Sequence, residues 1–89
     1  MRVVWTDQAA LDVERIAGYI AEENPAAARR MARELLVAGD SLAAFPGRGR
    51  RGRVLGTREL VAVFPYVIIY SVGADTVDIL RVWHGAQDR

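Results

Sequence analysis

The chain has 89 residues, 52% of them hydrophobic, and a formal net charge of +1, so we expect a single domain over residues 1–89 with a packed core. The absence of cysteine excludes disulfides and a thiolate nucleophile, and one histidine argues against structural zinc, so no metal or other cofactor is expected. No apolar run approaches the ~20 residues of a membrane span and the start lacks a signal-peptide core, which predicts a cytoplasmic protein without membrane contact.

The N-terminal residues predict a strand and a helix. The β-branched run at 2–5 is typical of a strand, and Thr6 after it is a favoured N-cap. Apolar residues then repeat at helical spacing to about Glu23, while Asp12 is assigned with other charged residues to a different side of the helix. We therefore expect an amphipathic helix whose apolar stripe faces the core.

A second helix follows after a short break. Asn24 is a favoured N-cap, and Pro25 occupies the first helical position, where its missing N–H costs nothing. An apolar stripe that includes Leu35 and Leu42 continues to about Ala44. Two helices joined by so short a connection are expected to form an antiparallel hairpin.

The C-terminal half predicts a loop and three strands. Proline and glycine in the segment 45–53 stop the second helix, and strand-like runs occupy 57–64, 66–72 and 76–83. The middle run is apolar on both faces, which fits a central strand, and residues 73–75 supply a hairpin turn. The order strand, helix, helix, three strands predicts an α+β fold, with the helical hairpin packed on one face of a mostly antiparallel four-stranded sheet.

The loop after the second helix is strongly basic. Arg48, Arg50, Arg51 and Arg53 place four charges within six residues, interleaved with glycines. All twelve basic residues of the chain are arginine, which suits bidentate phosphate binding, although a codon bias gives the same composition. The loop is therefore a candidate contact for nucleic acid phosphates or for an acidic protein. A solvated, flexible connection is the alternative.

Six short motifs follow one another along the chain. They are WTxxAxxDxxxIxxYI at 5–20, NPAA at 24–27, LxxFPxxGRxG at 42–52, REL at 58–60, PYxIxY at 65–70 and DxxxILRVxHGAxD at 75–88. In this combination the chain resembles toxins of the RelE/ParE superfamily from bacterial type II toxin–antitoxin modules. The resemblance covers nearly the whole length and implies the same strand–helix–helix–three-strand fold.

The superfamily divides by mechanism. RelE-like members cut mRNA in the ribosome without a metal, whereas ParE-like members poison DNA gyrase and show no nuclease activity. The HGAxD ending and the long helical hairpin resemble the ParE branch. The resemblance thus implies a toxin that inhibits DNA gyrase by binding. It also implies neutralisation by a cognate ParD-like antitoxin, which binds through its C-terminal segment in a toxin–antitoxin hetero-oligomer.

The nuclease alternative can be weighed from the chemistry of the residues. Metal-free RNA cleavage needs a base, an acid and cations around the phosphate; His84 is the candidate base, with Arg58 and Arg81 as cations. Val67 and Gln87 stand where many relatives have arginine, and neither side chain can stabilise charge on phosphorus. A ribosome-dependent mRNA endoribonuclease therefore remains the alternative, together with a non-toxic relative that still binds antitoxin.

For the gyrase reading we expect target contacts from Arg58, Arg81, His84, Gln87 and Arg89. The structural alternative, which is favoured for His84, places it at the end of the last strand, before a glycine turns the chain. One ring nitrogen would then bond to a backbone carbonyl or a carboxylate.

On the second helix, the expected antitoxin-binding groove consists of Ala28, Ala32, Val37 and Gly39, because small residues let a partner helix approach closely. Ordinary packing on the sheet is the alternative for that helix.

Overall fold

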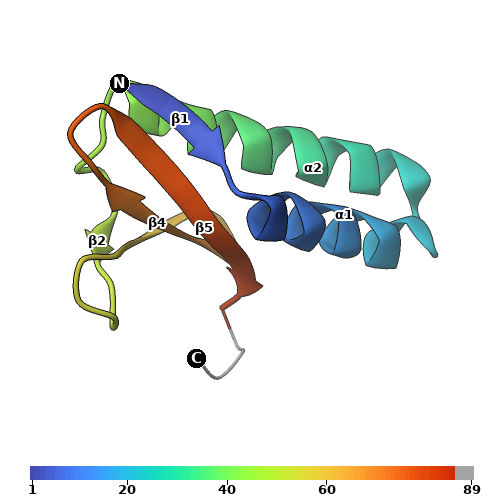
Figure 1. Cartoon of the computed structure of the whole chain (residues 1–89). Helices are drawn as coiled ribbons and strands as arrows, with labels where there is room; N and C mark the ends of the chain where they lie inside the picture. Colours follow the sequence, from blue (N-terminus) through green and yellow to red (C-terminus); the bar gives the residue numbers. More distant parts are fainter. Residues whose placement is uncertain (86–89) are drawn as a thin grey trace.

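The computed structural model describes residues 1–85. Two antiparallel helices lie along one side of a twisted sheet, and the N-terminal strand runs beside the last strand of the chain (Figure 1). The elements are β1 (Arg2–Trp5), α1 (Asp7–Ala21), α2 (Pro25–Asp40), the 3₁₀ turn η1 (Ser41–Ala43), β2 (Arg50–Arg51), β3 (Arg58–Val63), β4 (Tyr66–Val72) and β5 (Thr76–His84).

The sheet has the strand order β1-β5-β4-β3-β2, in which only the β1–β5 pair is parallel. The predicted α+β fold with a helical hairpin on one face is confirmed. The predicted central strand is β4, whose residues 67–70 are all buried. The sheet has five strands rather than four, because residues 50–51 of the basic loop pair with Arg58 and Glu59.

Both predicted N-caps are present. The Thr6 hydroxyl accepts a hydrogen bond from the Ala9 N–H at 3.2 Å, and the Asn24 side chain accepts one from the Ala27 N–H at 3.0 Å. The second helix ends at Asp40 rather than near Ala44. There the Ser41 hydroxyl donates to the Ala38 carbonyl at 2.6 Å, and the chain tightens into the 3₁₀ turn.

The core lies between the helices and the sheet. Its fully buried side chains include Leu35 and Leu42 from the helical side and Tyr70 and Ile79 from the sheet. At the edge of this core the Trp5 ring lies directly against Gly39, so that a β-carbon at position 39 would collide with the indole. No helix within residues 1–85 combines the length and apolar character needed to cross a membrane.

Candidate functional site

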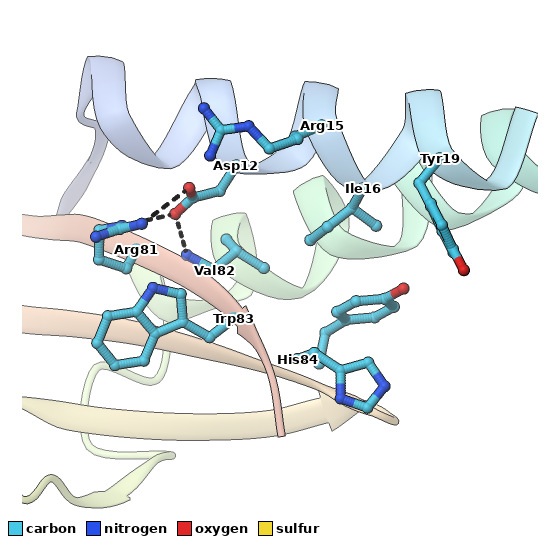
Figure 2. Close-up of a pocket in the computed structure, with 9 residues that line it drawn as sticks. Asp12, Arg15, Ile16, Tyr19, Arg81, Val82, Trp83 and His84 are labelled. Carbon is cyan, nitrogen blue, oxygen red and sulfur yellow. Dashed lines mark hydrogen bonds and ion pairs between the residues drawn. The ribbon is translucent and has the colours of Figure 1, made fainter. Parts of the chain in front are cut away.

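An open groove of about 510 Å³ separates α1 from the end of β5 (Figure 2). Helix α1 contributes a charged and aromatic wall, and β5 contributes the opposite wall together with one residue of β4. Tyr19 and His84 stand at the same end of the groove, and the Asp12–Arg81 pair closes the other end. The lining residues are Asp12, Arg15, Ile16, Tyr19, Tyr66, Arg81, Val82, Trp83 and His84.

The Asp12 carboxylate joins α1 to β5. It is 4% exposed and accepts hydrogen bonds from Arg81 Nε at 2.8 Å, Arg81 Nη2 at 3.2 Å and the Val82 N–H at 2.9 Å. Gln8 adds a fourth at 3.3 Å. Burial alone would raise the pKa of Asp12, but the hydrogen bonds from Arg81, Val82 and Gln8 outweigh it and hold the pKa below its ordinary value. Asp12 is therefore a charged structural anchor.

This role corrects the assignment of Asp12 to the polar side of its helix. The residue is three positions after the buried Ala9 and four before Ile16, so it lies on the core-facing side of α1. In the sequence, the core-facing position of Asp12 was indicated only by its spacing, which matches that of the apolar stripe. Its partner lies 69 positions away in the chain, where no local pattern indicates the pairing.

Arg81 is bound on two sides within the protein. Its guanidinium pairs with Asp12, and the guanidinium carbon lies 5.2 Å from the centre of the Trp83 ring. The hydrogen bond with Asp12 raises the pKa of Arg81 above its ordinary value. The side chain is 37% exposed, so one part of the guanidinium still faces the groove. Arg81 thus orients Trp83 and contributes positive charge that Asp12 largely neutralises.

His84 is the last residue of β5, as the structural alternative for it predicted. Its exposed ring meets the Tyr66 ring edge-on, with centroids 5.6 Å apart and an interplanar angle of 82°. The following Gly85 N–H donates to the Pro65 carbonyl at 2.6 Å and ties the chain to the turn between β3 and β4. The predicted hydrogen bond of a ring nitrogen stays a prediction.

The residues expected at one target surface are divided by the fold. Arg81 and His84 line the same groove, but Arg58 lies on β3, with β4 between it and β5. The Arg58 guanidinium donates to the Gly49 carbonyl at 2.7 Å and holds the basic loop. The three groups of the nuclease alternative are therefore not gathered around one point. Gln87 and Arg89 lie outside the described residues.

The four arginines of the basic loop belong to a segment that is attached to the fold. The Arg48 side chain donates to Ser41 at 2.9 Å, and Arg50 pairs with Glu59 at 3.1 Å. The Arg53 backbone N–H donates to the second Glu59 oxygen at 3.3 Å, and Arg51 lies in β2. The segment is not an unpaired connection, because its middle forms the fifth strand of the sheet.

The four residues expected to form one groove on the second helix do not do so. Ala28 and Gly39 are buried and Ala32 is half-buried, because these positions share the helical face of Leu35. Val37 is displaced from Gly39 by two positions, about 200° around the helix, and faces solvent. Val37 instead lines a separate groove between α2 and the end of β3, together with Arg33, Arg48 and residues 62–64.

Potential metal ligands do not cluster in the described part of the chain. Within residues 1–85 no three histidine, cysteine, aspartate or glutamate side chains come close enough together to hold a metal ion. The groove offers aromatic rings, a partly neutralised guanidinium and an exposed imidazole.

Comparison with known proteins places these features in a family. A family model described as "ParE toxin of type II toxin-antitoxin system, parDE" matches residues 3–89. The chain is 48% identical over 86 residues to Toxin RelE2 of Caulobacter vibrioides, covering 97% of each chain. It is 42% identical over 87 residues to Putative toxin Y4kP of Sinorhizobium fredii, covering 97% of this chain and 90% of that protein. A solved structure titled "Chromosomal ParDE TA system from P. aeruginosa" superposes with a TM-score of 0.83 at 27% identity, covering 94% of this chain and 95% of that one.

Proposed function

Since this chain belongs to the family of ParE toxins of type II toxin–antitoxin systems, we propose that it inhibits DNA gyrase by binding and is neutralised by a cognate antitoxin. Inhibition would act by stabilising the state in which gyrase has cleaved its DNA. Gyrase works in the cytoplasm, which is where we place the protein. The proposed role requires a surface complementary to the target and no reacting group on the toxin.

The main support for this proposal is that the Arg81 guanidinium is already paired within the protein. A nuclease needs uncompensated cations where charge develops on the phosphate, whereas the Arg81 guanidinium is paired with a buried carboxylate at 2.8 Å. Val67, the uncharged residue that follows Tyr66 in the PYxIxY motif, is 2% exposed within the central strand. The third group of the nuclease set, Arg58, is bonded to a backbone carbonyl on the far side of β4. These arrangements support recognition of a target rather than cleavage of RNA.

The antitoxin partner is proposed on two surfaces that are open in the single chain. One is the groove beside Val37, which contains the exposed Phe64 together with two arginines, Arg33 and Arg48, and one acid, Glu34. An amphipathic helix with acidic residues on its rim matches this combination. The other is the outer edge of β3 beyond Leu60, where β2 has already ended and backbone groups can pair with an added strand. A C-terminal antitoxin segment that is helical and then extended would occupy both, in a hetero-oligomer.

The proposal is tested with purified gyrase, supercoiled plasmid and ATP. Toxin separated from its antitoxin should release linear DNA from trapped cleavage complexes, and added antitoxin should abolish the linear product. His84→Ala and Tyr19→Ala, both in the groove, should weaken trapping. Arg29→Gln, at an exposed position on α2 that does not line the groove, should leave it unchanged.

Two outcomes lead to the alternatives. Folded toxin that arrests growth, leaves gyrase untouched and cuts mRNA in programmed ribosomes would be a RelE-like endoribonuclease, with His84 as the candidate base. Folded toxin that binds antitoxin but neither arrests growth nor acts on gyrase or ribosomes would be a non-toxic relative.

A further inference from the structure

A turn held by several hydrogen bonds joins β2 to β3. The Gly52 N–H donates to the Thr57 carbonyl at 2.8 Å, and the Thr57 N–H donates to the Val54 carbonyl at 3.1 Å. The Thr57 hydroxyl donates to the same Val54 carbonyl at 2.7 Å. Gly56 has a φ of 86°, which a side-chain-bearing residue adopts only with strain. These contacts fix the shape of the segment 53–57, which we call the ribbon tip.

The ribbon tip presents aliphatic side chains to solvent. Leu55 is 99% exposed and Val54 is 69% exposed. Both border a shallow hollow that also includes the exposed Val72 at the end of β4. The segment between β2 and β3 extends away from the helical hairpin (Figure 1), so no other part of residues 1–85 covers it. A rigid turn that holds two aliphatic side chains in water is suited to contact with another molecule.

Positive charge surrounds the ribbon tip. Residues 41–74 contain five arginines and a single acidic residue, Glu59. Glu59 is buried and engaged by Arg50 and by the Arg53 backbone N–H. The exposed charge of the ribbon is therefore wholly cationic. Arg51 lines the hollow beside the aliphatic residues, and Arg53 directly precedes Val54 in the chain. A partner for this surface combines closely spaced anionic groups with an apolar interior.

We propose that the ribbon tip is a contact site for duplex DNA, with Arg51 and Arg53 on backbone phosphates and Leu55 inserted into the minor groove against a base step. Two-stranded ribbons of known proteins enter the major or the minor groove of DNA, and leucine is among the side chains that wedge between base steps from the minor groove. Guanidinium groups bind phosphate oxygens bidentately. Two aliphatic side chains bury much less apolar surface than a single acyl chain, which by itself gives only marginal membrane binding. The inference rests on the proposed function, because a gyrase–DNA complex is where the toxin would meet a duplex.

Direct binding to DNA without gyrase is the test. A 20-base-pair duplex, labelled at one end, is titrated with the isolated chain at several salt concentrations and followed by fluorescence anisotropy. The double variant Arg51→Gln/Arg53→Gln should lower the slope of log K against log salt by about 1.8, at about 0.9 per phosphate contact. The matched double variant Arg29→Gln/Arg30→Gln, which removes the same charge from exposed positions on α2, should leave the slope unchanged.

The insertion of Leu55 is tested separately from the phosphate contacts of the arginines. Leu55→Ser should weaken duplex binding by at least about tenfold, because full burial of a leucine is worth more than a factor of ten in an equilibrium constant. The salt slope should stay the same. Energy transfer between dyes at the two ends of the duplex should increase when the unmodified chain binds and bends the DNA. With Leu55→Ser this increase should disappear. Leu11→Ser, at an exposed leucine on α1, should change neither quantity.

Several results would overturn the proposal. One is no duplex binding at 50 mM salt, and another is equal losses from the tip variants and their controls. A third is a Leu55→Ser variant that binds DNA normally but loses affinity for DNA-free gyrase or for vesicles rich in phosphatidylglycerol. The proposed function and this inference fail separately. Toxin that traps gyrase but binds no duplex contradicts the inference alone, whereas toxin that binds duplex through Leu55 without trapping gyrase contradicts the proposed function alone.

Discussion

The Asp12 carboxylate is the link that fixes β5 against α1. The variant Asp12→Ala removes the acceptor for Arg81 Nε, Arg81 Nη2 and the Val82 N–H in one step. We expect the protein to remain folded but to lose a large part of its stability. The end of β5, which carries Trp83 and His84 into the groove, should be the region most affected.

The magnitude follows from what each donor loses. The Val82 N–H is buried, and leaving such a group without an acceptor costs ~1–3 kcal/mol. The Arg81 side chain is 37% exposed, so water replaces much of the ion pair and its loss adds only ~1 kcal/mol. We therefore expect the free energy of unfolding to fall by ~3 kcal/mol, which lowers Tm by roughly 12–24 °C in a protein of this size. Asp12→Asn keeps an acceptor for Val82 and should lose about half as much.

Urea unfolding followed by circular dichroism measures the change, with Glu14→Ala on the same helix as the control. Because Glu14 is exposed, its variant should stay within ~0.5 kcal/mol of the unmodified protein. A double-mutant cycle with Arg81→Met isolates the coupling between the two side chains. An Asp12→Ala variant as stable as the Glu14→Ala control, or additive effects in the cycle, would refute the anchoring role.

The pH dependence rests on the same carboxylate. The pKa of Asp12 is held below the ordinary value of ~3.9, so the charged carboxylate stabilises the fold above that pH, and this stabilisation is lost as the pH falls through the folded-state pKa. In urea unfolding between pH 5 and 2, the free energy of unfolding of Asp12→Asn should therefore fall less steeply than that of the unmodified protein. Tyr70→Phe leaves the buried Gly49 N–H without its acceptor and should cost ~1–3 kcal/mol, and an unchanged Tm would contradict that. Gly39→Ala forces a methyl group against the indole above it and should lower Tm. Gly18→Ala, with open space around it, should raise Tm, and the same sign for both would contradict the packing argument.

Local patterns predicted the elements well where a single segment determines its own structure. The side chains of Thr6 and Asn24 accept hydrogen bonds from N–H groups in the first turn of the helix, which have no partner within the helix itself. Each of these residues therefore indicates where a helix begins. The run at 66–72 is apolar on both faces, which is typical of a central strand paired at both edges. These signals were sufficient for the two helices and for strands β1, β3, β4 and β5.

Features that depend on distant partners were not predictable in the same way. The strand β2 is two residues long, and it exists because Glu59 binds the loop, a contact that composition does not reveal. The small size of Gly39 indicated a close approach, but the approaching group is Trp5 of the same chain rather than a partner helix. Small residues on a helix therefore predict close packing without identifying what packs there.

The candidate site was predicted in part. The sequence indicated Arg81 and His84, which share the groove beside α1. It missed Asp12, whose charge changes the role of Arg81 from an available cation to a paired one. Leu55 was also missed, because an isolated leucine in a loop has no periodicity by which its exposure can be inferred.

The central claim is that this toxin acts by binding and not by turnover, and a stoichiometric titration tests it most directly. Toxin is added to a fixed amount of gyrase with excess supercoiled plasmid and ATP, and linear DNA is quantified after the complexes are denatured. We predict that linear DNA rises with toxin and reaches a plateau set by the gyrase concentration. The contradicting result is gyrase that is unaffected at every ratio, while the same toxin preparation cleaves many mRNA molecules per toxin in programmed ribosomes.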